Sequence, residues 1–286
     1  MNNSIKLQKI FNDLFPLNRS LTGLGNEKTL DYLNNLGAKL EKKYRNSGDQ
    51  VFDWVVPEEW WIKNAYIKNK FGEKIINFKN NNLHVVGYSD AVPKCIMSES
   101  GLLEKLHVSP KSKNAIPYRT SYYKKDWGFC CTSDLLNSEK FIGPFEVFID
   151  SGFKKDGKLV WGERFFKGFS DREFILTTYI CHPSLANDNL SGIITNFLIM
   201  EKLEKLPKTR YSYRFGFFPE TIGALCFLDA HPNNTLILGG AVIANTGGPG
   251  EYSIKESFDN KHFTNQALKI VAEKSLASYE IYEFTP

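Results

Sequence analysis

The sequence lacks the features that mark several large classes of protein. No apolar run approaches the roughly 18 residues that a membrane-spanning helix needs, and the first ten residues hold no apolar core of a signal peptide. The net charge of +4 over 286 residues is small, and no basic block interrupts it. We therefore expect a cytoplasmic protein that binds neither nucleic acid nor a membrane.

Cysteine is scarce as well. The five cysteines are an odd number without CxxC spacing, which suits reduced thiols better than a disulfide framework. Charged residues at 24% and hydrophobic residues at 42% are ordinary for a globular protein, and the length suffices to bury a full α/β core. Only the aromatic share, 14%, is high.

The first half of the chain predicts helices and then a β-rich unit. Leucine and isoleucine at helical spacing predict helices over residues 4–14 and 27–44. Short aromatic and β-branched runs, separated by Gly, Asn, Asp and Pro, follow from residue 51 to about 148, with one helix at 98–106. We predict a β-rich domain at 51–148, inserted into an α/β domain formed by residues 1–50 and 149–286.

The second half alternates between strands and helices. Strands are predicted at 173–180, 211–218 and 235–245, and helices at 188–203, 221–230 and 265–276. Such alternation indicates βαβ units and a mainly parallel sheet. Right-handed crossovers then bring all three strand carboxyl ends to one edge of the sheet.

Polar residues follow each of these carboxyl ends, where ligands bind in open α/β sheets. His182 follows the first strand and Asp188 begins the next helix, while Glu220 follows the second strand and Asn245–Thr246 the third. Imidazole nitrogen and carboxylate oxygen are zinc ligands, and a carboxylate without a metal bond can take the proton of a metal-bound water. The sequence therefore indicates a metal site, with Glu220 as the base.

Each of these residues also has an ordinary structural interpretation. Asp188 would serve as a helix N-cap, His182 as a hydrogen-bonded histidine at a strand end, and Glu220 as a first-turn acid that favours the helix dipole. Cys181 beside His182 is set aside as a nucleophile, because neighbours on a strand point to opposite faces.

Five segments together resemble one family of bacterial and archaeal proteins: FPLNRSLTGLG, DWVVPEEW, IPYRTSYYKKDWGFC, YICHPSLANDNLSG and PETIGA. These are aminopeptidase-like proteins with an inserted domain of unknown function, often encoded near surface-polysaccharide genes and distantly related to zinc aminopeptidases. The resemblance covers nearly the whole chain. It implies a phosphorylase/aminopeptidase-like three-layer α/β/α sandwich with a mixed sheet, plus the inserted β-rich domain.

The resemblance also implies roles for the site residues. His182 matches a zinc ligand, Asp188 the aspartate that bridges two zinc ions, and Glu220 the general base. Thr221 stands where the superfamily has a second acid, and Asn245–Thr246 replaces a further aspartate, so one zinc ion is favoured over two. Family members continue beyond the position of Pro286 with a further histidine for the metal shell; without it the site would bind metal weakly.

The sequence thus predicts a metal-dependent hydrolase that cleaves a peptide or amide bond of a small substrate, linked to polysaccharide biosynthesis. The same residues would serve an enzyme that deacylates or forms amides on sugar substituents. The alternative is a non-catalytic relative, in which aromatic residues of the inserted unit bind a glycan or a protein. These residues are Trp54, Trp60, Trp61, Tyr118, Tyr122, Tyr123 and Trp127. The sequence contains no pattern that indicates whether the protein forms a homo-oligomer.

Overall fold

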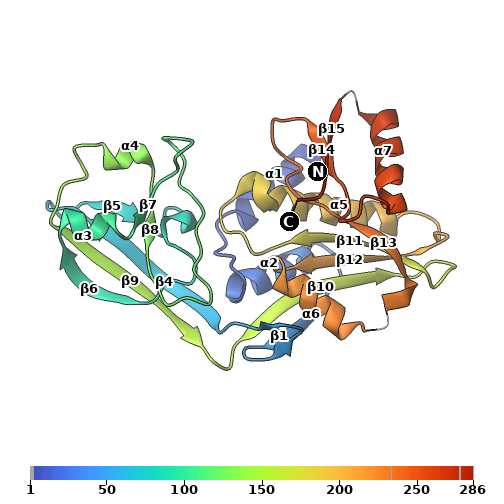
Figure 1. The fold of residues 1–286 in the computed structure, drawn as a ribbon, viewed down its shortest axis with the longest axis horizontal. Helices are drawn as coiled ribbons and strands as arrows, with labels where there is room; N and C mark the ends of the chain where they lie inside the picture. Colours follow the sequence, from blue (N-terminus) through green and yellow to red (C-terminus); the bar gives the residue numbers. More distant parts are fainter. Residues whose placement is uncertain (1–2, 233, 277, 286) are drawn as a thin grey trace.

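The computed structural model of the chain describes residues 3–232, 234–276 and 278–285, which form two lobes (Figure 1). The larger lobe is built on a five-stranded sheet. In spatial order its strands are β1 (Glu41–Asn46), β10 (Lys158–Phe166), β12 (Ser212–Phe218), β11 (Glu173–Tyr179) and β13 (Ile237–Val242). The neighbours β1, β10 and β12 are antiparallel, whereas β11 runs parallel to both β12 and β13, so the sheet is mixed.

The three strands predicted in the second half of the chain are confirmed, and they are mutually parallel. The register pairs Glu173 with Ser212 and Tyr179 with Phe218, so β11 and β12 end at the same level. The predicted meeting of three carboxyl ends at one edge of the sheet is therefore confirmed.

Helices cover both faces of this sheet, which gives the three-layer sandwich. One face packs against α1 (Asn3–Leu14), α2 (Leu24–Asn35) and α5 (Gly192–Glu204), and α6 (Ile222–Ala230) lies on the other. Each face of the sheet has its own hydrophobic core. Successive side chains of β10 point to opposite faces, so Val160 packs with α1, α2 and α5 whereas Trp161 packs with α6.

The predicted helix over residues 27–44 is wrong in its second half. The helix α2 ends at Asn35, and Gly37 follows at a φ of 95°, a conformation that glycine adopts readily and that closes a helix. Residues Glu41–Asn46 instead form the edge strand β1, paired with β10. Leu36 and Leu40 continue the leucine spacing of α2 but lie outside the helix. Leu40 is buried in the core because it directly precedes β1.

The smaller lobe has an antiparallel sheet and a core of its own. Its strands in spatial order are β5 (Lys74–Asn77), β4 (Glu59–Lys68), β9 (Phe145–Lys154) and β6 (Val92–Met97). The predicted helix near residues 98–106 is α3 (Glu99–Leu103), capped by Ser98. The strand β9 extends past the predicted boundary at residue 148, and the division into two domains stays a prediction.

Shorter elements complete both lobes. Parts of the predicted β-rich unit are mainly loops. Within residues 82–89 and 116–131, the regular elements are η1 (Asn82–His84) and β8 (Phe129–Cys130). The remaining elements are β2 (Gln50–Val51), β3 (Trp54–Val55), β7 (Leu106–His107), α4 (Ser133–Leu136), η2 (Ala186–Ser191), η3 (Asn234–Leu236), β14 (Tyr252–Lys255), α7 (Phe263–Ser275) and β15 (Tyr279–Tyr282).

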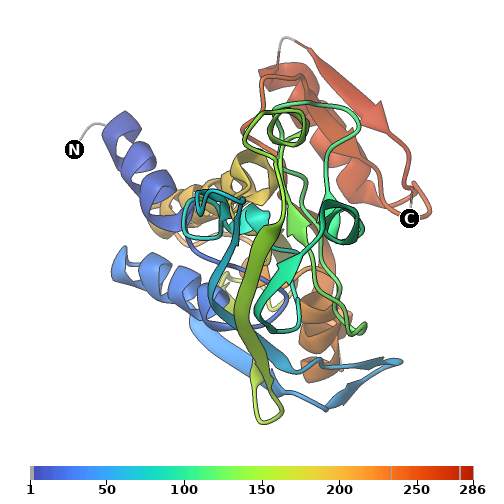
Figure 2. The ribbon, with the colours of Figure 1, turned by 90° about the vertical axis from the view of Figure 1, so that its left-hand side faces the viewer.

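The chain ends of the described part lie on different sides of the molecule. With the smaller lobe toward the viewer, α1 and α2 lie to its left, and β14, α7 and β15 to its upper right (Figure 2). Within the described residues, no helix has both the length and the apolar character needed to cross a membrane.

Candidate functional site

His182 lies in the loop that follows β11, and its residue surface is 8% exposed. Two side-chain contacts hold this loop against the N-terminal segment. The buried Arg19 guanidinium donates to the His182 carbonyl oxygen at 3.0 Å and to the Leu14 carbonyl oxygen at 2.6 Å. The Ser184 hydroxyl donates to the Phe15 carbonyl oxygen at 3.1 Å. The end of α1 therefore fixes the backbone that carries His182.

Asp188 lies in the irregular turn η2, where it and Asn189 have non-helical dihedral angles. The Tyr179 hydroxyl donates to Asp188 Oδ1 at 2.5 Å. The Asn189 amide in turn donates to the Tyr179 carbonyl oxygen at 2.9 Å. The helix α5 begins only at Gly192, so the interpretation of Asp188 as the N-cap of this helix is wrong.

Glu220 follows β12 and points toward His182. Its carboxylate Oε2 lies 3.7 Å from His182 Nε2, and 53% of its side chain is exposed. Its backbone N–H donates to Cys181 Sγ at 3.2 Å. Because α6 begins at Ile222, Glu220 precedes the helix and is not an acid of its first turn.

Cys181 lies closer to the site than its place in the sequence predicts. Its Sγ is 3.5 Å from His182 Nδ1, and one ligand atom from each of Cys181, His182 and Glu220 falls within 4.8 Å of the others. The expectation that the two neighbours point apart is wrong, because β11 ends at Tyr179 and strand alternation no longer applies. Burial raises the pKa of the Cys181 thiol to about 12, so it is a poor nucleophile and acts as the acceptor for the Glu220 N–H.

Asn245, which follows the third parallel strand, β13, contacts the site through Tyr179 of β11. The sequence did not identify Tyr179 as a site residue. The Asn245 amide donates to the Tyr179 hydroxyl at 3.4 Å, and the Asn245 N–H donates to Asn189 Oδ1 at 3.2 Å. Thr246 turns away, with its hydroxyl 2.8 Å from that of Thr195. The sequence signal was the position of Tyr179 near the end of the strand predicted at 173–180.

The electrostatics leave the site with available ligand atoms. Burial lowers the pKa of His182, which favours the neutral imidazole although Asp188 and Glu220 act in the opposite direction. Burial, together with the hydrogen bond to Asp188, raises the pKa of Tyr179, so its phenol keeps its proton. Within the described part of the chain, no lysine or arginine pairs with Asp188 or Glu220.

The side chains of His182, Asp188 and Glu220 are of the types that bind zinc in proteins. One imidazole and two carboxylates free of basic partners are present at the carboxyl edge of the sheet, and the Tyr179 hydroxyl already holds Asp188. Among the described residues, the ligand atoms that lie within 4.8 Å of one another come from Cys181, His182 and Glu220, so Asp188 lies outside this group. Thr221 and Asn245 supply no carboxylate for a second ion, and the expectation of a single ion stays a prediction.

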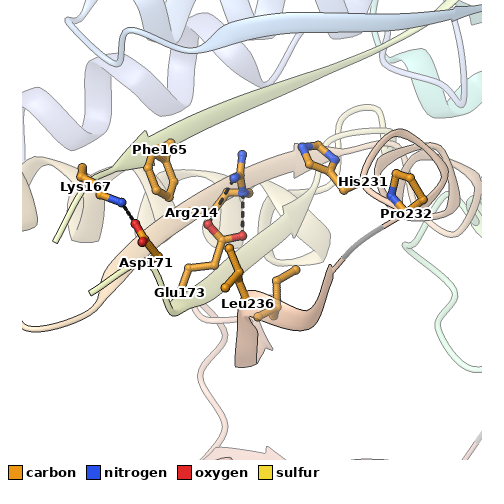
Figure 3. A pocket seen from close by; sticks show the side chains of 9 residues that line it. Phe165, Lys167, Asp171, Glu173, Arg214, His231, Pro232 and Leu236 are labelled. Atoms are coloured by element: carbon orange, nitrogen blue, oxygen red, sulfur yellow. Dashed lines mark hydrogen bonds and ion pairs between the residues drawn. The ribbon is translucent and has the colours of Figure 1, made fainter. Parts of the chain in front are cut away.

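A second group of acids, which begins with Glu173 at the opposite, amino edge of the parallel strands, is fully paired; Figure 3 shows Glu173 paired with Arg214. Arg214 forms two hydrogen bonds of 3.1 Å with Glu173 and a third, also of 3.1 Å, with Glu163. Trp161 donates to the other Glu163 oxygen at 2.6 Å, and His231 Nε2 lies 3.7 Å from Glu163. A pocket of about 320 Å³ opens beside this network, but its carboxylates already have partners.

The aromatic residues of the smaller lobe do not form a single binding face. Trp60 is buried in the core beside α6, and Trp127 packs in the core of the smaller lobe. Tyr123 packs against Trp54, whereas Tyr118 packs against His182. The structure thus gives no support to a non-catalytic module built on these rings.

The fold is that of the zinc aminopeptidases. A zinc aminopeptidase from Bacillus subtilis superposes with a TM-score of 0.60 at 11% identity, over 97% of this chain and 79% of that one. A peptidase M28 precursor from Shewanella amazonensis gives a TM-score of 0.61 at 13% identity, over 98% and 78%. At these identities the likeness is one of fold alone, and it defines the fold class as aminopeptidase-like.

The chain belongs to the family described as "Domain of unknown function (DUF4910)", whose model matches residues 8–286. It is 41% identical over 285 residues to a Clostridium acetobutylicum protein described as a candidate polysaccharide biosynthesis protein with an aminopeptidase-like domain, covering 98% of this chain and 64% of that protein. The crystal structure of a candidate peptidase from Clostridium acetobutylicum has a TM-score of 0.93 at 40% identity, over 99% and 66%. The family resemblance and the fold class are confirmed, and the chain spans just under two thirds of the length of both relatives.

Proposed function

We propose that this chain is a cytoplasmic metal-dependent hydrolase of the aminopeptidase-like type, which cleaves a peptide or amide bond of a small substrate. One observation carries the proposal: the His182 imidazole faces the Glu220 carboxylate at 3.7 Å in a site where no basic side chain of the described residues neutralises the acids. The family relatives described by peptidase or polysaccharide-biosynthesis names support this choice of chemistry and of biological setting.

His182 and Asp188 would hold one zinc ion, and Tyr179 would orient Asp188 through its hydroxyl. Bound zinc would lower the pKa of a coordinated water toward about 7 and polarise the substrate carbonyl. Glu220, which is more than half exposed and ends beside His182, would take a proton from the attacking water and deliver it to the leaving amine.

Hydrolysis of a panel of aminoacyl para-nitroanilides by the purified chain tests the proposal. We expect turnover that ortho-phenanthroline abolishes and added zinc restores, whereas the non-chelating isomer meta-phenanthroline has no effect. Turnover that withstands the chelator, or no turnover of any amide in the panel by zinc-loaded protein, would contradict it.

A further inference from the structure

The loop that joins β7 to β8, residues 108–128, brings a tyrosine of the smaller lobe into the site of the larger one. The Tyr118 ring packs against the His182 ring, tilted by 48° and with 4.8 Å between the ring centroids. His182 follows β11 of the larger lobe, whereas the loop belongs to the smaller lobe, which contains β4 and β9 (Figure 1). The site is therefore composed of residues from both lobes.

Backbone hydrogen bonds hold the loop in this place. The Gly87 N–H donates to the Arg119 carbonyl oxygen at 2.9 Å, and the Ser121 N–H donates to the Gly87 carbonyl oxygen at 2.9 Å. These bonds begin at the residue next to Tyr118, so the ring has a defined anchor. A side chain held in this way can act on a substrate without a costly rearrangement.

The Tyr118 hydroxyl has no hydrogen-bond partner within the described residues, whereas those of Tyr179 and Tyr88 do. Tyr118 is half-buried, and its hydroxyl is not among the buried polar atoms without a partner, so it is open to solvent and to a ligand. A tyrosine phenol ordinarily titrates near pH 10, so the Tyr118 hydroxyl is a proton donor near neutral pH. An unused donor thus lies in a partly buried site that contains His182 and two carboxylates.

We propose that Tyr118 is a catalytic residue whose hydroxyl donates a hydrogen bond to the substrate oxygen that becomes negatively charged when water adds to the scissile carbonyl. The phenol keeps its proton throughout, and no bond to Tyr118 forms or breaks. Donors aimed at such an oxygen raise kcat by about 10²–10³-fold each in well-studied hydrolases. This inference rests on the proposed hydrolase function.

The test compares Tyr118→Phe with Tyr122→Phe in the full zinc-loaded chain. Tyr122 lies in the same loop, and its ring packs on Tyr88 and Tyr123 away from His182, so its variant controls for the loss of a hydroxyl. The ligands are the amino acid whose para-nitroanilide the wild type cleaves fastest and the phosphonic acid analogue of that amino acid. The phosphonate has the tetrahedral, charged oxygens of the addition step, and the amino acid lacks them.

We expect Tyr118→Phe to weaken phosphonate binding by at least about tenfold and to lower kcat by a similar factor, with amino acid binding within about twofold of the wild type. Zinc content, melting temperature and the Tyr122→Phe control should stay at the wild-type level. Unchanged phosphonate binding in Tyr118→Phe, or equal losses in both variants, would overturn this inference and leave the hydrolase proposal standing. A zinc-loaded wild type that neither cleaves an amide nor binds a phosphonate would overturn both.

Discussion

The two edges of the same sheet hold acids in opposite states. Toward the amino edge, Glu173 and Glu163, which reaches the same arginine from β10, are 7% and 3% exposed, and every carboxylate oxygen meets a donor from Arg214 or Trp161. At the carboxyl edge, Glu220 faces only a histidine and has no basic partner among the described residues.

This difference separates an acid that maintains the fold from one that is available for chemistry. A buried carboxylate is tolerated when a guanidinium pairs with it, and removing one partner leaves an uncompensated charge. An unpaired carboxylate beside a neutral imidazole costs little while it remains exposed, and it keeps its lone pairs for a cation or a proton. The candidate site is therefore identified by carboxylates that lack a basic partner, and the presence of acids alone would not identify it.

The largest expected effect follows from removing the charge of Glu220. We expect Glu220→Gln to lower kcat by about 10²–10⁴-fold, because the general base is lost. The melting temperature should not change, since the side chain is 53% exposed and pairs with no lysine or arginine. Steady-state kinetics and thermal denaturation check this beside Glu104→Gln, an exposed acid of the smaller lobe. A kcat within about threefold of the wild type would remove Glu220 from the mechanism.

The opposite edge should respond in stability rather than in activity. Arg214→Met leaves Glu163 and Glu173 buried without their cation, so the free energy of unfolding should fall by about 3–5 kcal/mol. Urea denaturation measures the change, with the exposed Arg172→Met as the matched control. Zinc affinity of the folded variant should equal that of the wild type. An unfolding midpoint that stays in place would mean that this network contributes nothing to the fold.

A smaller effect is expected where a partner only orients a ligand. Tyr179→Phe removes the hydroxyl that donates to Asp188 at 2.5 Å. We expect the zinc affinity to fall by about 10–100-fold, the usual result when such an orienting partner of a ligand is lost. Competition with a chromogenic chelator measures the affinity, and Tyr211→Phe, whose ring packs on Phe174, is the control. Equal affinities in all three proteins would show that Asp188 needs no such support or binds no metal.

The smallest effect is expected at an exposed acid that has partners. The Arg164 and Lys39 hydrogen bonds lower the pKa of Glu204 from 4.5 to about 2. Because this pKa is lower in the folded state than in the unfolded state, the stabilisation is present above pH 4.5 and is lost as the pH falls toward 2. Glu204→Gln should therefore cost less than about 1 kcal/mol at pH 7, since solvent screens the pair.

Urea denaturation of wild type and Glu204→Gln at several pH values tests this sign. The difference between the two proteins should shrink as the pH is lowered. A difference that grows in acid, or that exceeds the effect of Arg214→Met, would show that exposure does not govern the strength of these pairs.

Local patterns predicted the parallel strands and the edge where ligands bind, because both follow from periodicity and the handedness of crossovers. The same reasoning failed at residues 41–46, where leucine spacing continued a helix that Gly37 ends. It also did not identify β10, which became visible only as the partner of β1 and β12. Pairing between distant segments decides such strands, and a local pattern does not contain it.

The candidate site was predicted in the same uneven way. His182, Asp188 and Glu220 could be found because each follows a strand, but their roles as metal ligands and base stay predictions. Tyr179 and Tyr118 could not be assigned, since a hydrogen bond across a turn and a ring contact between lobes depend on the tertiary fold.

Anomalous diffraction from zinc-soaked crystals of this chain shows directly whether His182 and Asp188 bind a metal. We expect one strong zinc peak at the carboxyl edge, about 2.0–2.2 Å from a His182 nitrogen and an Asp188 oxygen, and its loss in His182→Ala. If no peak lies at these two residues under zinc saturation, or if the peak persists in His182→Ala, they are not the metal ligands.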